Sequence, residues 1–375
     1  MRRRGLPVLL LLLTASTSNA DGNAWKFGGY YKNLFVHTET SIGTPQEVTL
    51  DLNRLRLELQ HNWGQAASFD LQYDNELLWG NYLETEQFRA LDLDPPAALD
   101  LEHVYAHDDE RLARHRVYRA TLQLHNEVMD LTLGRQRIAW GTGRFWSPLD
   151  VLNPFDPVRI ERDERVGVDS AVFDFPRGAL GKFELVYAAN TSMESGATAG
   201  YFHSHIGATD YSFVVGDFRG ERMAGADFAG HLGEQGVRGE LTITRPRSGA
   251  AFMRALLGFD YSAQNTLNLT FELYFNGSGE TSPEMYPLLA PRNGGSLAQK
   301  YAGASASYEI TPVIKISTYL VMNFDDQSHA IAPQLAWSLS DNLELAFGAQ
   351  TFAGPARSEF GRLKDVYYAQ VQMFF

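Results

Sequence analysis

The residues most able to act on a solute by charge are concentrated in one stretch, residues 133–170. This stretch reads LGRQRIAWGTGRFWSPLDVLNPFDPVRIERDERVGVDS and mixes arginines with acids, aromatic residues, glycines and prolines. Opposed charges across a narrow, water-filled passage select small polar solutes by charge and dipole. We predict a pore constriction with these candidate residues: Arg135, Arg137, Arg144, Asp150, Asp156, Arg159, Arg162 and Asp163. The alternative is a salt-bridge network that only holds the segment in place.

Residues 139–168 are predicted to be a loop that folds inward, because they depart from strand periodicity while remaining rich in aromatic residues. Trp140, Trp146 and Phe155 supply apolar surface for packing. Three prolines in the segment lack a backbone donor and cannot join a strand ladder. Irregular backbone at membrane depth must be buried in protein or line water. We therefore expect this loop to pack in the lumen or across it.

Other reactive patterns in the chain are weak. His103 with His107, and His203 with His205, have spacings that suit a metal pair, but no third ligand is dictated. The segment GTGRFW lacks the third glycine of a dinucleotide fingerprint, and the chain contains neither GxSxG nor HExxH. We predict no catalytic residue, metal or cofactor. An outer-membrane enzyme that uses the acids after His107 is kept as an alternative.

The chain opens with MRRRGLPVLLLLLTASTSNA, which has the layout of a secretory signal peptide. Three arginines precede an apolar run that is too short to span a bilayer, and Ser18-Asn19-Ala20 offers small residues for cleavage. We predict a signal peptide over residues 1–20, with an N-terminal anchor as the alternative. Its removal takes away three arginines and no acid, so the formal charge changes from −13 to −16 in residues 21–375.

The composition excludes several protein classes. The chain has no cysteine, which excludes disulfides, thiolate metal sites, a cysteine nucleophile and covalent haem attachment. No later segment reaches about 18 uninterrupted apolar residues, so membrane-spanning helices are not expected. The negative charge argues against nucleic acid as a partner. A soluble periplasmic protein and an outer-membrane barrel both remain compatible with the composition.

Alternation of apolar and polar residues with period two recurs throughout the chain after residue 24. One clear face consists of Leu267, Leu269, Phe271, Leu273 and Phe275. Seventeen such segments are recognised, near residues 25–37, 47–60, 66–76, 113–125, 127–138, 169–176, 181–190, 205–217, 221–229, 236–246, 251–261, 267–275, 299–310, 314–324, 328–339, 343–351 and 363–375. Alternation over about ten residues between turns is typical of a transmembrane β-barrel. A half-buried sheet in water would show the same pattern.

The connectors between these segments alternate in length. Thr311-Pro312, 340–342 and 262–266 are short and fall on one side, whereas 276–296 and 352–362 are long and fall on the other. We predict periplasmic turns and outer loops respectively, and we interpret 77–112 as a large, partly helical outer loop, with an unrecognised strand pair as the alternative. Strand counts from the two ends conflict between residues 169 and 217. A bacterial barrel needs an even number, so we predict an all-β, transmembrane antiparallel β-barrel of 16–18 strands, with sixteen the best fit.

The chain ends with a strand-like segment, VYYAQVQMFF. Tyr367, Val371, Met373 and Phe375 alternate on one face, which we expect to meet lipid, with Phe375 at the periplasmic interface. A terminal Phe preceded by apolar residues at every second position resembles the signal read by the barrel-assembly machinery. Phe374 falls on the opposite face and has no role in this interpretation.

Residues 134–157, GRQRIAWGTGRFWSPLDVLNPFDP, resemble a motif of poorly characterised porin-like barrels of proteobacteria: Gly-Arg-Gln, then Trp-Gly, then Asn-Pro. The long loop also follows the fifth candidate strand, where general porins of sixteen strands place their constriction loop. This resemblance, together with the C-terminal strand, implies an outer-membrane barrel of a Gram-negative bacterium. It does not imply a substrate.

The predicted function is passive passage of small hydrophilic solutes or ions through the outer membrane. The expected surroundings are outer-membrane lipid and lipopolysaccharide, and the barrel-assembly machinery is the expected partner during insertion. A homo-oligomer is a further possibility. One alternative is an insulating sleeve around a multihaem cytochrome, which would need no cofactor of its own. A channel should conduct ions alone, whereas a sleeve should co-purify with its cytochrome.

Overall fold

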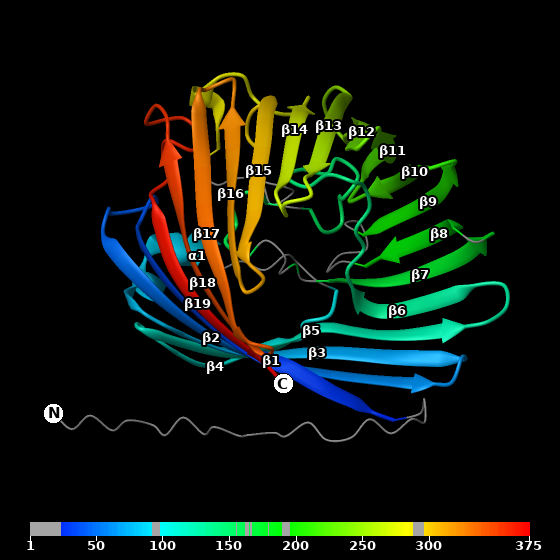
Figure 1. Cartoon of the computed structure of the whole chain (residues 1–375), viewed down its shortest axis with the longest axis horizontal. Helices are drawn as coiled ribbons and strands as arrows, with labels where there is room; N and C mark the ends of the chain where they lie inside the picture. Colours follow the sequence, from blue (N-terminus) through cyan, green and yellow to red (C-terminus); the bar gives the residue numbers. More distant parts are fainter. Residues whose placement is uncertain are drawn as a thin grey trace.

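The structure is a computed structural model that describes residues 24–91, 98–154, 156–161, 165, 167–178, 180–189, 196–287 and 296–375. Its strands form one antiparallel sheet that closes on itself, because β1 (Lys26–Glu39) pairs with β19 (Val366–Phe374) as well as with β2 (Glu47–Trp63). Figure 1 shows the resulting barrel, with strands from the two ends of the chain side by side. The predicted signal peptide, residues 1–20, lies outside the described residues.

Hairpins connect most of the remaining strands. These strands are β3 (Ala67–Trp79), β4 (Glu102–Asp108), β5 (Arg111–His125), β6 (Asp130–Gln136), β7 (Val168–Arg177), β8 (Gly181–Ala188), β9 (Ala197–Ile206), β10 (Thr209–Phe218), β11 (Glu221–Leu232), β12 (Gln235–Arg245), β13 (Phe252–Ser262), β14 (Asn268–Asn276), β15 (Lys300–Thr311), β16 (Ile314–Asn323), β17 (Ser328–Ser340) and β18 (Leu343–Ala353).

The barrel wall contains 18 of these 19 described strands, because β4 is an accessory strand. β3 pairs with one edge of β5 along its length. On the other edge, β4 pairs with residues 111–116 and β6 pairs with residues 120–125. β4 and β6 therefore share one edge of β5, and only β6 continues the wall. The even number suits a barrel whose ends lie on the same side.

The predicted strand range is confirmed, but the preference for sixteen was wrong. Seventeen segments were recognised and the missing strand is β9, with the sequence ATAGYFHSHI. Its inward face begins with Ala197 and Ala199, and its outward face includes Gly200, so apolar and polar residues hardly alternate. The turn that follows consists of only Gly207 and Ala208. The end of β9 was therefore merged with β10, where the two counts conflicted.

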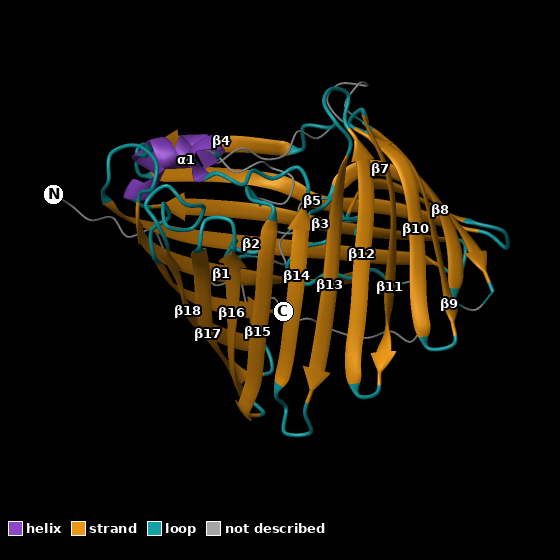
Figure 2. Ribbon diagram, turned by 90° about the horizontal axis from the view of Figure 1, so that it is seen from above, coloured by secondary structure: helices purple, strands orange, loops and turns teal. Residues whose placement is uncertain are grey.

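Connector lengths place the two ends of the barrel. The turns after β15 and β17 have two residues each, whereas the opposite end carries the long segments 137–167 and 277–299. The segment after β3 contains η1 (Asn81–Glu84) and α1 (Glu86–Leu91) before β4, and η3 (Pro283–Met285) lies in the later loop. Figure 2 shows α1 and β4 together at one end. No helix in the described residues is long and apolar enough to cross a bilayer.

The outer face of the wall is apolar, as the alternation predicts. On β8, Leu185 and Tyr187 are 45% and 47% exposed, whereas Val186 and Ala188 between and after them are buried. Exposed Leu257 on β13 continues this pattern. An apolar outer band with the polar backbone fully paired is what a bilayer requires of a spanning sheet.

The C-terminal strand closes the barrel. Phe375 exchanges two backbone hydrogen bonds with Gly29, each 3.1 Å long. Tyr367, Val371 and Met373 are exposed on one face of β19. Phe374 packs edge-on against the ring of Tyr30, with ring centroids 6.1 Å apart. The residue without a role in the sequence interpretation therefore contributes to the seam between β1 and β19.

Candidate functional site: an inward loop and a basic patch

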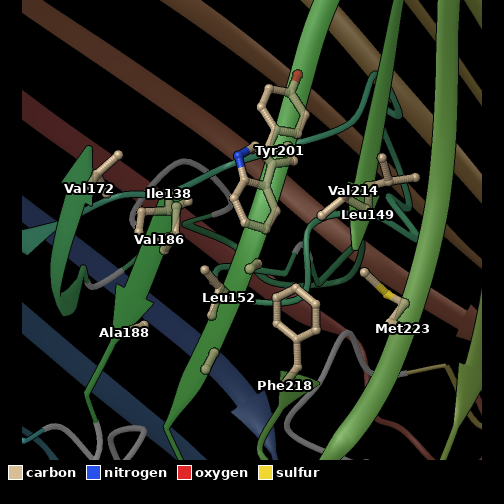
Figure 3. Packing of buried hydrophobic residues seen from close by; sticks show 13 residues of the cluster. Ile138, Leu149, Leu152, Val172, Val186, Ala188, Tyr201, Val214, Phe218 and Met223 are labelled. Atoms are coloured by element: carbon tan, nitrogen blue, oxygen red, sulfur yellow. The ribbon is translucent and has the colours of Figure 1, made fainter. Parts of the chain in front are cut away.

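The loop between β6 and β7 packs against the inward-facing side chains of the barrel wall, on the face opposite the exposed apolar band. Its apolar side chains Ile138, Leu149 and Leu152 are buried. Figure 3 shows them among wall residues from β7 to β11, including Val172, Val186, Tyr201, Val214, Phe218 and Met223. Each fully buried side chain of this size contributes about 1.5–3 kcal/mol. This part of the inner wall is apolar because a protein segment covers it in place of water.

Two tryptophan stacks fix the loop along the wall. The ring of Trp140 lies over Tyr201 on β9, with centroids 5.3 Å apart and planes 8° from parallel. The ring of Trp146 lies over Tyr274 on β14, at 5.2 Å and 12°. Phe145 packs beside Trp146 and is 1% exposed. The stacks lie on strands well apart around the barrel, so the loop runs along the inner wall from β9 to β14.

The loop also has its own buried ion pair. Arg165 donates from Nη1 to Asp150 Oδ2 at 2.7 Å, and the Asp150 carboxylate accepts the Asn153 N–H at 3.1 Å. Burial raises the pKa of the Asp150 carboxyl well above its usual range, while Arg137 and the Asn153 N–H act in the opposite direction. This cluster ties the end of the loop to its middle.

A basic patch lies on the opposite side of the barrel, where charged residues occupy every second position on three neighbouring strands. Its members are Lys32 on β1, Arg54 and Arg56 on β2, Asp74 and Glu76 on β3, Glu102 on β4, Arg114, Arg116 and Arg119 on β5, and Glu161 of the loop. Six cations meet four acids among these residues. The patch therefore carries an excess of positive charge.

The two wall acids of the patch are fully occupied by arginines. Asp74 accepts two hydrogen bonds from Arg56, at 2.6 and 2.7 Å. Glu76 accepts from Arg54 at 2.7 Å and from Arg114 at 2.8 Å. Both acids are 0% exposed. They act as a fixed scaffold that holds the guanidinium groups in place.

Glu161 is the one acid of the patch that comes from the loop. Its two oxygens accept from Arg54 Nη1 and Nη2 at 2.8 and 3.2 Å, and one of them also accepts from Lys32 Nζ at 3.1 Å. Its side chain keeps 15% exposure. The Arg54 fork and the Lys32 ammonium thus form a seat for a carboxylate, and an acid of this chain occupies it.

An apolar cavity of about 430 Å³ adjoins this seat. It is lined by side chains of β1 and β2 such as Leu34, Leu50 and Leu52, and by Ile160 and Glu161 of the loop. A small organic anion could place its carbon skeleton here and its charge toward Lys32 and Arg54. A second cavity of about 380 Å³ lies between the loop and residues 278–287 and 296–297, with Trp146 and Arg254 in its lining.

The predicted constriction residues that the structure describes are not brought together in one place. Arg135 forms a buried pair with Asp169, 2.9 Å apart, and donates to Leu99 O at 2.7 Å, so it ties β6, β7 and the segment before β4. Arg137, Asp156 and Arg159 are exposed. Arg159 lines the apolar cavity. The backbone of Arg144 binds the wall, and Phe155, Arg162 and Asp163 lie outside the described residues.

The basic patch was missed in the sequence. Its signal is Arg-x-Arg at positions 54 and 56, Asp-x-Glu at 74 and 76, and Arg-x-Arg again at 114 and 116. Each pair lies in a strand that was recognised, so charges spaced by two could have identified an inner face. Neither histidine pair gains a third ligand, and no group of three or more metal-binding side chains occurs among the described residues.

No protein-family model and no curated protein matches the chain. Its structure is similar to the outer membrane protein OpdK of Pseudomonas aeruginosa, with a TM-score of 0.60 and 10% identity over 94% of this chain and 98% of that one. The fold is that of an outer-membrane β-barrel. Acinetobacter baumannii OccAB4 matches with a TM-score of 0.57 and 8% identity, over 95% of this chain and 100% of that one. A structure of OpdK with vanillate matches at 0.61 and 11% identity, over 94% and 98%.

Proposed function

We propose that this protein is an outer-membrane channel through which small hydrophilic solutes pass passively, with a preference for organic anions. The observation that carries the proposal is the seat formed by Lys32 and Arg54, which already holds a carboxylate beside the lumen. A solute carboxylate that displaces Glu161 would meet the same donors.

The charge of the patch supports the direction of this preference. Cationic side chains along a pore attract anions and repel cations, and low-dielectric walls focus the field. Buried Asp74 and Glu76 hold Arg54, Arg56 and Arg114 in fixed rotamers, so little ordering is needed when an anion arrives. The mature chain is acidic overall, but this local excess is positive, and a passing ion responds mainly to charges within about 10 Å.

The comparisons support the proposal at the level of fold. OpdK was crystallised with vanillate, which is a small aromatic carboxylate. The apolar cavity beside Lys32 and Arg54 is compatible with a solute that has an apolar body and one anionic group. We extend this solute class to the present chain as part of the proposal.

The loop argues against the cytochrome sleeve. It contacts Tyr201 on β9, Tyr274 on β14, Gln350 on β18 and Arg54 on β2, so its contacts surround the lumen. A cytochrome inside the barrel would have to displace all of them. No bond is made or broken in passive passage, and the proposal needs no cofactor or catalytic residue.

Swelling of proteoliposomes tests the proposed preference. Gluconate and glucose have similar size and differ in one carboxylate, so size exclusion treats them alike. We expect faster entry of gluconate at equal osmotic strength. Entry of glucose at the same rate or faster, through protein that shows the heat-modifiable gel shift of a folded barrel, would contradict an anion preference.

A further inference from the structure

We infer that Glu240 and Glu272 are positioning residues that set the aperture of the channel, by holding the inward loop through its backbone N–H groups. The inference rests on the proposed function only where it concerns conductance. Both glutamates are on the wall, on β12 and β14, and both are buried, at 4% and 0% exposure. Neither belongs to the basic patch.

Glu240 collects donors from one turn of the loop. Its Oε1 accepts the N–H of Thr142 at 2.6 Å and that of Gly143 at 2.7 Å. Its Oε2 accepts the N–H of Leu149 at 3.1 Å and the hydroxyl of Ser147 at 3.0 Å. One carboxylate thus binds both ends of the segment 142–149.

Glu272 binds the middle of the same segment. Its Oε1 accepts the N–H of Arg144 at 2.6 Å, and its Oε2 accepts the N–H of Phe145 at 2.9 Å. Arg238 on β12 donates to Oε1 from Nη2 at 2.9 Å and keeps this carboxylate oriented. Five backbone N–H groups of the loop therefore donate hydrogen bonds to two wall carboxylates.

The local sequence is shaped for this contact. Gly141 has a φ of +88°, and a Cβ atom there would lie 2.7 Å from Glu240 Oε1. A Cβ on Gly143 would lie 1.6 Å from Trp146 O. A side chain at Gly141 would collide with Glu240, and one at Gly143 would collide with the turn of the loop itself, so the glycines in WGTGRFW allow the close approach. In this motif, backbone N–H groups of residues 142–145 donate to the two wall carboxylates.

The position of segment 142–149 affects the pore because the same loop also contacts the basic patch. These N–H groups belong to no strand ladder. Without the glutamates they would lose their hydrogen-bond acceptors, and the segment would be held less firmly against the wall. The same loop continues to Glu161 at the carboxylate seat, and to Val158, whose carbonyl accepts from Gln350. Its position along the wall therefore fixes how much of the lumen is open between the loop and the basic patch.

The test uses the double variant Glu240→Gln, Glu272→Gln, which keeps side-chain size but replaces one acceptor oxygen of each group with an amide donor. The matched control is Glu344→Gln on β18, since Glu344 forms no hydrogen bond or ion pair among the described contacts. Two readouts are compared: single-channel conductance, and the rate at which a charged thiol reagent modifies Val151→Cys in the loop. The natural chain has no cysteine, so the label is specific.

We expect the double variant to conduct more, with noisier open levels, and to be modified at least severalfold faster at position 151, while the control stays at the wild-type values. A folded double variant with unchanged conductance and unchanged modification rate overturns the inference. If the double variant does not fold, Glu272→Gln alone and Ser147→Ala carry the same test, with smaller changes expected in both readouts. A wild-type barrel without conductance would contradict the proposed function, while the modification rate would still decide the role of the two glutamates.

Discussion

Replacing Glu161 with Gln removes the one loop acid from the basic patch and leaves the wall residues unchanged. The carboxylate now neutralises part of the charge of Arg54 and Lys32, at 2.8 and 3.1 Å. Its loss raises the charge excess of the patch by one unit. The amide oxygen can still accept one hydrogen bond from Arg54, so the loop keeps a contact at this point. We expect Glu161→Gln to make the channel more selective for anions.

The size of the effect follows from electrostatics in a hydrated pore. An ion that passes about 7 Å from the removed charge changes its energy by about 0.3–0.6 kcal/mol, depending on screening by salt. Anions gain this amount and cations lose it, so the permeability ratio of anion to cation should rise about three- to sevenfold. A solute carboxylate should also meet less competition at the seat, and a model anion such as vanillate should reduce the ionic current at lower concentration.

The assay is the reversal potential of single channels in a planar bilayer under a KCl gradient. Glu127→Gln is the control, because Glu127 is exposed in the turn after β5, at the end of the barrel opposite the loop, and its loss changes the net charge equally. An unchanged or reduced ratio in a folded Glu161→Gln channel would refute the role given to the seat. An equal rise in Glu127→Gln would show that only net charge matters.

Three further predictions follow from single contacts. Arg135→Ala should destabilise the barrel by about 3–5 kcal/mol, because Asp169 is left charged and buried. Arg137 is exposed, so Arg137→Ala should change ion selectivity without changing the temperature of the gel shift. Burial raises the pKa of Glu359 to about 7, so this group favours the folded state when protonated and its contribution falls as pH rises from about 5 to 7. The last outer loop should accordingly resist protease better at pH 5 than at pH 8, and Glu359→Gln should abolish that difference; equal resistance at both pH values would count against it. Deleting Phe375 removes two hydrogen bonds to Gly29 and should lower the yield of folded barrel in the membrane, and a normal yield would argue against an assembly signal.

The barrel could be predicted from the sequence because membrane strands must alternate and must all be paired. Every strand of the wall except β9 had a recognisable segment, and β9 failed because Ala197, Ala199 and Gly200 give little contrast between its two faces. β4 was not recognised either, since it lies in residues 77–112, whose sequence we interpreted as a partly helical outer loop. It is a strand only because the outer half of β5 offers an edge that β6 does not reach.

The site could be predicted only in part. The unusual composition of residues 139–168 marked the loop, but its charges turned out to serve different roles, since Arg135 is buried against Asp169 and Arg137 is exposed. Which wall residues the loop meets depends on distances around the closed barrel, and these are not local in sequence. Glu240 and Glu272 look like ordinary inner-wall residues until the backbone of the loop is placed against them.

The reversal potential of the purified wild-type barrel in a planar bilayer shows whether the protein is a channel with an anion preference. We expect discrete openings from the protein alone, with chloride more permeant than potassium. A barrel that shows the heat-modifiable gel shift but no conductance, or one that prefers potassium, would contradict this expectation.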